Sequence, residues 1–298
     1  MRYLKILFIG FLLVGCTPSK KESIKVLAPT GAPALSLVEQ VSLNENQIDF
    51  VTGSEVLSAE LVKTDSEYDI IYAPVNLGCK MIQNGKSTYR LAAVITWGNL
   101  YVVGTKEGLI NPTKFTSFGE GTVVDFVLKN ALDMSKYEVE YFSSAQEVQT
   151  QLLTGKTNLA MLAEPAVTAT IQKAKQNNIE LYELGNLQYL YQTNTNSETE
   201  GFPQAAIFVK EGSETKVRKF IKSIESWTNV TAVNTPEKIE QLVDSVGAET
   251  LGVPSALISK NTWDRQNIKY VDASTCTQDL ETFLSLMGIT YSKEMLVK

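Results

Sequence analysis

The side chains that carry most enzyme chemistry are scarce in this 298-residue chain. It has no histidine and three cysteines, and no two cysteines have the CxxC spacing of a metal or redox site. Ser-His-Asp and Cys-His catalysis both need the missing imidazole, and a metal site would lack its commonest ligands. Cys79 and Cys276 are expected as free, partly buried thiols, with a disulfide as the alternative. The composition argues against these enzyme classes and predicts neither a metal nor a cofactor.

Backbone donors are the groups best suited to hold a small molecule. The stretch IKVLAPTGAPALSLVEQV (24–41) reads as a strand, a turn and a helix. Gly31 relieves the steric limits of the turn, and Pro33 suits a first helical turn, so free N–H groups there are expected to face a ligand. The stretch has neither the P-loop pattern nor the three spaced glycines of a dinucleotide site. It therefore predicts a ligand site of another kind.

The N-terminal segment reads as an export signal. Residues 1–15 contain Arg2 and Lys5, followed by an apolar run too short to span a bilayer in the mature protein. LVGC (13–16) resembles the bacterial lipobox, in which the leader is removed before the cysteine and Cys16 is lipid-modified; the alternative is an ordinary signal with a chance cysteine. Residues 16–23 read as a flexible, lipidated tether. Together they predict a protein anchored in the cell membrane on its extracytoplasmic side.

The body after this leader is acidic. Removal of residues 1–15 takes away two positive charges, so the formal net charge falls from −6 to −8. An acidic body lacks the basic footprint of a nucleic-acid-binding protein. Apolar residues make up 44% of the chain and charged residues 20%, which is typical of a globular fold.

Strand-like and helix-like segments alternate along the body. The alternation predicts a mainly parallel sheet with helices on both faces and ligands at the carboxyl ends of its strands. Two long apolar runs, residues 91–105 and 202–210, could each leave one domain and enter the next. The predicted first lobe consists of residues 24–105 and 205–298, the last part largely helical, and it is interrupted by a second lobe over residues 106–204.

An ordered set of motifs resembles a known family. APTGAP, DIIYAPVNLG, AAVITWGNLYVVG, GEGTVVDFVLKNAL, LLTGKTNLAMLAEP and GFPQAAIFV follow one another along nearly the whole mature chain. Their order, with the lipobox, is similar to type II periplasmic binding proteins of the nitrate, sulfonate, taurine and thiamine-precursor class of ABC-transporter solute-binding lipoproteins. The resemblance implies an α/β protein of two lobes joined by crossover strands, which closes on a small molecule and serves an ABC permease as a monomer.

The resemblance also places the ligand against loops from both lobes. The implied ligand-binding residues are Thr30, Gly31, Ala32, Pro33, Asn76, Trp97, Asn99, Gly121, Thr122 and Glu164. Several have a second interpretation. Thr30 and Asn76 are suited to cap the helices that follow them, Trp97 could be a core residue, and Gly121 could serve only its turn. Glu164 could hold the lobes together instead of selecting the ligand.

The charges of these loops narrow the expected ligand. They contain no lysine, arginine or histidine, and Glu164 is acidic. An anion would depend on backbone N–H groups alone, so a neutral or cationic flat heterocycle such as a thiamine-type aminopyrimidine is expected. Arg90, Lys106 or Arg265 would change that balance if the fold brought one of them into the cleft.

Three other functions stay open. The first is the same transport role for a sulfonate or another small anion. The second is an enzyme of the same fold, against which the missing histidine and the export signal both count. The third is a receptor or adhesin whose cleft has lost its ligand.

Overall fold

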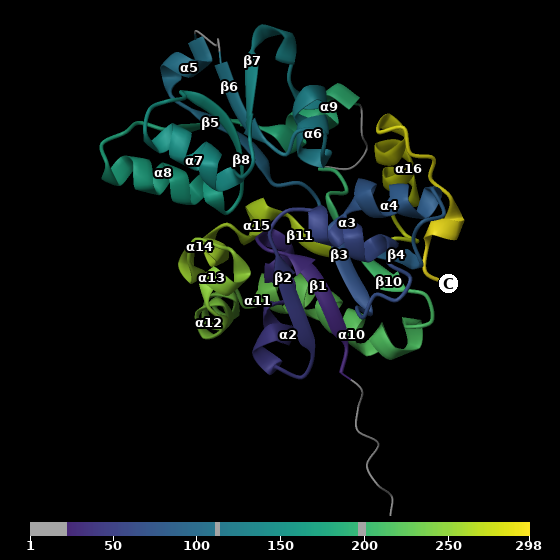
Figure 1. Cartoon of the computed structure of the whole chain (residues 1–298). Coiled ribbons are helices and arrows are strands. Elements are labelled where there is room, and N and C mark those ends of the chain that lie inside the picture. Colours follow the sequence, from purple (N-terminus) through teal and green to yellow (C-terminus); the bar gives the residue numbers. More distant parts are fainter. Residues whose placement is uncertain (1–22, 111–113, 196–200) are drawn as a thin grey trace, which may run out of the picture.

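The strands form two separate sheets, each with helices on both faces (Figure 1). The computed structural model describes residues 23–110, 114–195 and 201–298. In that part of the chain, one sheet has six strands in the order β11-β4-β10-β3-β1-β2, and the other has five in the order β7-β6-β8-β5-β9. We call the half built on the first sheet lobe 1 and the half built on the second lobe 2.

The sheet of lobe 1 combines early and late parts of the chain. Its strands are β1 (Lys25–Pro29), β2 (Gln47–Val51), β3 (Ile70–Pro74), β4 (Tyr89–Thr96), β10 (Ala205–Lys210) and β11 (Ile268–Asp272). β1 runs parallel to β2 and β3, whereas β10 lies antiparallel between β3 and β4, and β11 is antiparallel to β4. The sheet is therefore mixed, not mainly parallel, and β11 is a strand in a region predicted as largely helical.

Helices cover both faces of this sheet. They are α1 (Ala32–Leu35), α2 (Val38–Leu43), α3 (Glu55–Val62), α4 (Val75–Gln83), α10 (Glu214–Ser226), the π-helical turn η2 (Trp227–Thr231), α11 (Ala232–Asn234), α12 (Glu237–Val246), α13 (Ala248–Leu251), α14 (Ala256–Asn261), α15 (Trp263–Gln266), α16 (Thr277–Leu286) and the 3-10 turn η3 (Lys293–Met295). α10 packs on one face through Phe220 and Ile224, and α3, α4 and α16 pack on the other through Leu57, Cys79 and Phe283.

The helix predicted after the first turn is two helices. α1 ends where the Ser36 hydroxyl donates a hydrogen bond to the Pro33 carbonyl at 2.6 Å and the Ser36 N–H donates to the same oxygen at 3.2 Å. A serine that bonds to the backbone of the preceding turn competes with the regular helix ladder. The chain then re-enters a helix at Val38.

Lobe 2 is a smaller unit formed by one continuous part of the chain. Its elements are β5 (Leu100–Gly104), α5 (Lys106–Ile110), β6 (Lys114–Phe118), α6 (Val123–Ala131), the 3-10 turn η1 (Met134–Lys136), β7 (Glu138–Phe142), α7 (Ala145–Leu153), β8 (Leu159–Ala163), α8 (Ala166–Gln176), β9 (Tyr182–Asn186) and α9 (Leu187–Thr195). β6 is parallel to β7 and β8, and β5 is antiparallel to β8 and β9. α7 and α8 cover one face of the sheet (Figure 1).

The first passage between the lobes lies earlier than the predicted boundary after Thr105. β5 pairs with β8 and β9, so residues 100–104 belong to the sheet of lobe 2. The long strand expected over residues 91–105 is interrupted at Gly98, which has a φ of +93°. A Cβ there would lie 2.7 Å from the Phe202 ring, so the chain can turn here only with glycine.

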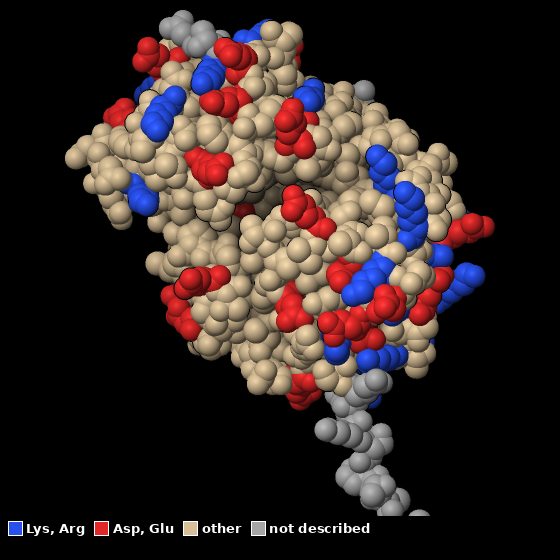
Figure 2. Space-filling view, viewed as in Figure 1, with Lys and Arg blue, Asp and Glu red and all other residues tan. Residues whose placement is uncertain are grey.

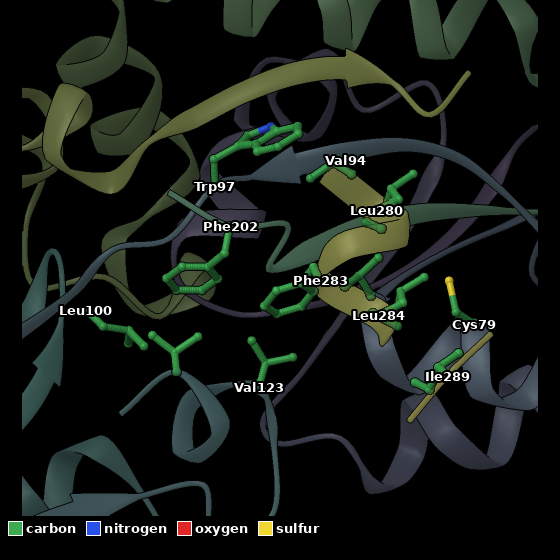
Figure 3. Close-up of a cluster of buried hydrophobic side chains, with 14 of the residues drawn as sticks. Cys79, Val94, Trp97, Leu100, Val123, Phe202, Leu280, Phe283, Leu284 and Ile289 are labelled. Carbon is green, nitrogen blue, oxygen red and sulfur yellow. The ribbon is translucent and has the colours of Figure 1, made fainter. Parts of the chain in front are cut away.

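A single cluster of buried side chains crosses from one lobe to the other. Phe283 of α16, Phe202 and Trp97 contribute from the side of lobe 1, and Leu100 and Val123 contribute from lobe 2 (Figure 3). The lobes therefore share a core beside the crossings. Farther from it, the molecular surface is hollowed between them (Figure 2).

Candidate functional site

The carboxyl ends of parallel strands from both lobes face each other at the crossings. β4 ends at the first crossing, and β1 and β3 run in the same direction as β4. In lobe 2, β8 ends beside the start of β5, because Ala163 pairs with Leu100, and β6 runs parallel to β8. α/β sheets bind ligands at such ends. We call the loops at these ends the cleft loops: residues 30–33, 74–76, 119–122 and 163–165.

Backbone N–H groups of the first cleft loop, which were expected to be free, donate hydrogen bonds within the protein. The Thr30 N–H donates to the Val51 carbonyl at 3.0 Å, and the Gly31 N–H donates to the Leu251 carbonyl at 2.8 Å. Gly31 adopts a φ of +90°, which suits glycine. Since both N–H groups are bonded within lobe 1, the prediction that they face a ligand is wrong.

The rest of this loop belongs mainly to the core of lobe 1. Ala32 is buried in the cluster formed by α1, α2 and α12–α15, and Pro33 lies in the first turn of α1. The N-cap position of α1 is Gly31, without a side-chain hydrogen bond, so Thr30 is not the cap. The Thr30 hydroxyl is therefore the group of this loop best placed to remain a candidate contact.

Asn76 brings an unsatisfied acceptor to the second cleft loop. It is the second residue of α4, whose N-cap is Pro74, so Asn76 does not cap the helix. Its Oδ1 is buried and accepts no hydrogen bond from any described residue. The side-chain Oε1 of Gln204 is likewise buried and accepts no hydrogen bond from any described residue. The backbone carbonyl of Gln204 accepts from the Val75 N–H at 3.0 Å, which places this residue beside the second cleft loop. Sequence reasoning missed Gln204, although it lies within the GFPQAAIFV motif.

Trp97 is a core residue in this structure. Its side chain is 1% exposed and packs among Phe202 and Leu280 (Figure 3). The Lys269 ammonium lies 5.1 Å from the centre of the ring, a favourable cation–π arrangement. A ring covered in this way has no free face for a flat ligand, so the structure favours the second interpretation of Trp97, that of a core residue.

Asn99 and Glu164 connect the first crossing with the end of β8. The Asn99 amide donates to the Glu164 carbonyl at 2.8 Å, and the Glu164 N–H donates to the Asn99 carbonyl at 2.9 Å. The Asn99 Oδ1 is buried, and within the described chain it has no donor. Buried polar atoms usually find a partner, so this oxygen is a candidate ligand contact.

The Glu164 side chain is fully engaged in contacts within the protein. It is completely buried. Its Oε1 accepts from the Thr168 hydroxyl at 2.8 Å and from Arg265 Nε at 2.7 Å, and its Oε2 accepts from the Thr168 N–H at 3.2 Å. Arg265 Nη2 also donates to Glu183 at 2.6 Å. Glu164 therefore joins the lobes, which is the second of the two roles open from the sequence.

These contacts also affect the ionisation of Arg265. Burial opposes its charge, but the hydrogen bonds to Glu183 and Glu164 outweigh this and raise the pKa of Arg265 above its ordinary value. The guanidinium remains charged and paired with two carboxylates. It is consequently a poor anchor for an anionic ligand in this arrangement.

The third cleft loop is held by its own hydrogen bonds. Thr122 is the N-cap of α6: its Oγ1 accepts from the Val124 N–H at 3.3 Å and donates to the Gly119 carbonyl at 2.5 Å. The Gly121 N–H donates to Asp125 Oδ2 at 2.9 Å. Gly121 is exposed with a φ of +70°, and no atom lies within 4 Å of the position of a Cβ. Thr122 is thus a cap, while the open surface at Gly121 is accessible to a ligand.

The two other basic residues that could have changed the charge of the cleft are paired elsewhere. Arg90 forms an ion pair with Glu211 at 2.8 Å, and the Lys106 ammonium lies 5.0 Å from the centre of the Tyr182 ring. Arg265 is the one of the three that reaches the other lobe.

Two of the three cysteines lie in the described part of the chain. Cys79 and Cys276 are free and buried, as favoured from the sequence. Burial raises the pKa of each thiol to about 12. Cys16 and the lipobox lie outside the described residues. Within those residues, no helix has the length and apolar character needed to cross a membrane.

The fold matches solved structures of transport proteins. An ABC transporter structure from Parabacteroides distasonis has a TM-score of 0.77 and 23% identity, over 93% of this chain and 99% of that chain. The periplasmic aliphatic sulphonate binding protein SsuA from Escherichia coli has a TM-score of 0.61 and 14% identity, over 90% and 87%. The alkanesulfonate-binding protein SsuA from Xanthomonas axonopodis pv. citri, bound to MOPS, has a TM-score of 0.60 and 12% identity, over 92% and 96%.

These likenesses establish the fold. The chain has the two-lobed α/β fold of periplasmic binding proteins, which confirms the fold predicted from the sequence. No protein-family model matches the chain. No curated protein sequence matches it either.

Proposed function

We propose that this chain is an extracytoplasmic solute-binding protein that binds a small molecule between its lobes and presents it to an ABC import permease. The observation that carries the proposal is the architecture: two α/β lobes with facing strand ends, in a fold that matches an ABC transporter structure over 93% of this chain. The work of such a protein is closure of the lobes. Ligand contacts made only in the closed arrangement drive that closure, and no bond is formed or broken.

The proposed ligand is a neutral or cationic heterocycle with N–H donors, such as a thiamine-type pyrimidine. Its support is the set of buried amide oxygens of Asn76, Asn99 and Gln204, which accept no hydrogen bond from the described residues. A buried acceptor without a donor costs about 1–3 kcal/mol, which a ligand N–H would recover. The N–H groups of Thr30 and Gly31 are already bonded, which leaves an anion fewer donors.

A sulfonate or another small anion is the second candidate. Two of the similar solved structures are sulfonate-binding proteins, and one of them holds MOPS. For this candidate, the remaining backbone N–H groups at the helix starts beside the cleft would supply the binding. The two candidates differ in the charge of the ligand and can be separated by one experiment.

A thermal-shift screen tests both candidates. The chain from residue 23, which holds all described strands of both sheets, is heated with thiamine-type pyrimidines, other heterocycles, sulfonates, nitrate and amino acids. A ligand at about a hundredfold over its Kd adds about 2.7 kcal/mol, which raises Tm by several degrees. A shift with heterocycles supports the first candidate, and a shift with anions alone supports the second. Stabilisation by none of them would favour a receptor or adhesin without a ligand.

We also propose that Cys16 carries a lipid anchor and that the protein acts as a monomer. The support is the order of charged segment, apolar run and LVGC in the sequence. Mass spectrometry of the membrane fraction should find an acylated N-terminus at Cys16, and Cys16→Ser should release the protein from the membrane. An unmodified N-terminus elsewhere would refute the anchor.

A further inference from the structure

We propose that Arg265 is an interlobe latch that holds the two lobes in the arrangement of this structure. Arg265 belongs to α15 of lobe 1, and its side chain donates to Glu164 at 2.7 Å and to Glu183 at 2.6 Å, both in lobe 2. The guanidinium also lies 4.4 Å from the centre of the Tyr101 ring. One side chain thus contacts three residues of the opposite lobe.

The acceptor of the latch, the Glu164 carboxylate, is held in place by contacts within lobe 2. Thr168 holds both oxygens of Glu164 through its hydroxyl and its N–H, at 2.8 and 3.2 Å. These contacts lie within lobe 2 and do not depend on lobe 1. The Glu164 carboxylate is completely buried in this arrangement, and Arg265 is its cationic partner. Separation of the lobes would remove the charge-assisted hydrogen bond from Arg265 Nε, and this loss favours the latched arrangement.

Backbone contacts strengthen the attachment of α15 to lobe 2. The Tyr101 hydroxyl donates to the Arg265 carbonyl at 3.1 Å. Both the main chain and the side chain of Arg265 therefore take part. Removal of the guanidinium alone should weaken the latch without removing every contact between α15 and lobe 2.

The base of the latch is fixed at the crossing. Asn267, directly after α15, donates through Nδ2 to the Trp97 carbonyl at 2.8 Å, and its own carbonyl accepts from the Trp97 N–H at 3.0 Å. Glu183 lies farther from the crossing, opposite Val103 of β5, which is about 10 Å along the strand from Leu100. A rotation of the lobes about the crossing would therefore separate Arg265 from Glu183.

The latch makes the protein favour one arrangement of its lobes before any ligand binds. Ligand binding needs to supply less free energy when the protein already prefers the arrangement that binds. This consequence for affinity rests on the proposed function, whereas the effect of Arg265 on the distance between the lobes does not. The contacts are charged and the Arg265 side chain is partly exposed, so salt should weaken them.

The distance between the lobes tests the latch without any ligand. Spin labels attached through Gln172→Cys in α8 and Leu257→Cys in α14 report it by double electron–electron resonance. The labelled protein is the chain from residue 23, which leaves out Cys16; its native thiols Cys79 and Cys276 are buried and free, so labelling is selective for the introduced sites. Arg265→Gln should lengthen the mean distance or broaden its distribution by several Å, and Glu183→Gln should do so less.

Matched variants separate the latch from a loss of stability. Lys129→Gln breaks an ion pair with the buried Asp125, 2.8 Å long and wholly inside lobe 2, so it should lower Tm and leave the distance unchanged. Arg265→Lys keeps the charge without the two-armed geometry and should fall between wild type and Arg265→Gln. An unchanged distance distribution in Arg265→Gln would overturn the latch. Failure of every compound to bind, with a changed distance in Arg265→Gln, would instead refute the proposed function alone.

Discussion

The rings of Phe202 and Phe283 stack at the return crossing, with centroids 5.9 Å apart and planes 15° from parallel. Phe202 leads into β10, and Phe283 lies in α16, near the end of the chain. Phe283 also meets edge-on the rings of Tyr191 in α9, at 6.1 Å, and Phe126 in α6, at 5.9 Å. A helix of lobe 1 is thereby packed against two helices of lobe 2, beside the crossing.

Phe283→Ala should therefore destabilise the whole protein. Loss of a buried phenylalanine side chain typically costs about 3–5 kcal/mol, and here the cavity would open between the lobes. Chemical unfolding measures the loss. Leu286→Ala, on the same helix but 45% exposed, serves as the control and should cost far less. Equal effects of the two substitutions would refute the structural role of Phe283.

Gly252→Ala should disturb the first cleft loop. Gly252 has a φ of +66°, and a Cβ there would lie 2.5 Å from the Thr30 Cβ. The variant should lose more than the about 1–2 kcal/mol expected for a left-handed backbone alone. Gly212→Ala is the control, because its φ is +88° and no atom lies within 4 Å of its Cβ position. Unfolding curves of both variants should differ clearly, and equal losses would argue against the contact.

Asn76→Leu should separate stability from binding. Because the Asn76 Oδ1 is buried and accepts no hydrogen bond from the described residues, its replacement by an apolar side chain should leave Tm nearly unchanged or higher. Affinity for a compound found in the thermal-shift screen should fall about tenfold, the loss of about 1.4 kcal/mol. Asn130→Leu, which removes an amide that donates to the Phe126 carbonyl at 2.8 Å, should leave affinity unchanged. Calorimetric titration measures the affinities of both variants. An unaltered affinity in Asn76→Leu would show that Asn76 is not part of the binding site.

The thiols should be inert in the folded protein. With a pKa of about 12 for both Cys79 and Cys276, only about one thiol in 10⁴ is ionised at pH 8. A disulfide exchange reagent should therefore react slowly with the native chain from residue 23, and with both thiols after unfolding in guanidinium. A variant with Gln172→Cys provides a reactive control. Fewer than two thiols after unfolding would indicate a disulfide.

Asp125 should contribute to stability above acid pH. Burial opposes its charge, but hydrogen bonds from Lys129, Tyr141 and the Gly121 N–H lower the pKa of Asp125 below its ordinary value. Since the folded pKa is the lower one, the unfolded chain binds a proton first as the pH falls. The stabilisation is present above the unfolded pKa and is lost as the pH falls through the folded pKa.

Urea unfolding from pH 7 to pH 3 measures this dependence. Asp125→Asn should be less stable than wild type at pH 7 and should lose less stability on acidification. Glu249→Gln, at an exposed position of α13, should follow the wild-type curve. A wild-type acid dependence in Asp125→Asn would assign the effect to other carboxylates.

Local patterns predicted the elements of this fold better than its contacts. The pattern of residues 24–41 predicted a strand, a turn and a helix, and the structure has β1, a turn and the helices α1 and α2 there, because the apolar side chains of these elements are buried. β11 was missed, since IKYVD is five residues long and follows a helical region. Gly98 and Asn99 visibly interrupt the apolar run of residues 91–105, but the sequence does not show that the strand ends there, because apolar residues continue on both sides.

Local sequence patterns could not predict which side chains pair with each other at the crossings. Arg265 and Glu164 are 101 residues apart in the chain, and neither has a local signal that it pairs with the other. Likewise, the Leu251 carbonyl that takes the Gly31 N–H comes from α13, far along the chain. The loops were identified by their place at strand ends, whereas the free groups within them depend on contacts that form only in the folded protein.

The position of β10 determines the order in which the lobes can be completed while the chain is being synthesised. β10 lies between β3 and β4, so the sheet of lobe 1 has a gap until residue 210 has emerged from the ribosome. Lobe 2 needs only residues 100–195. A chain that emerges N-terminus first can therefore complete lobe 2 before lobe 1. Until then, β3 and β4 each have an edge without its partner strand. The early part of lobe 1 is the segment that needs protection from misassembly until its central strand arrives.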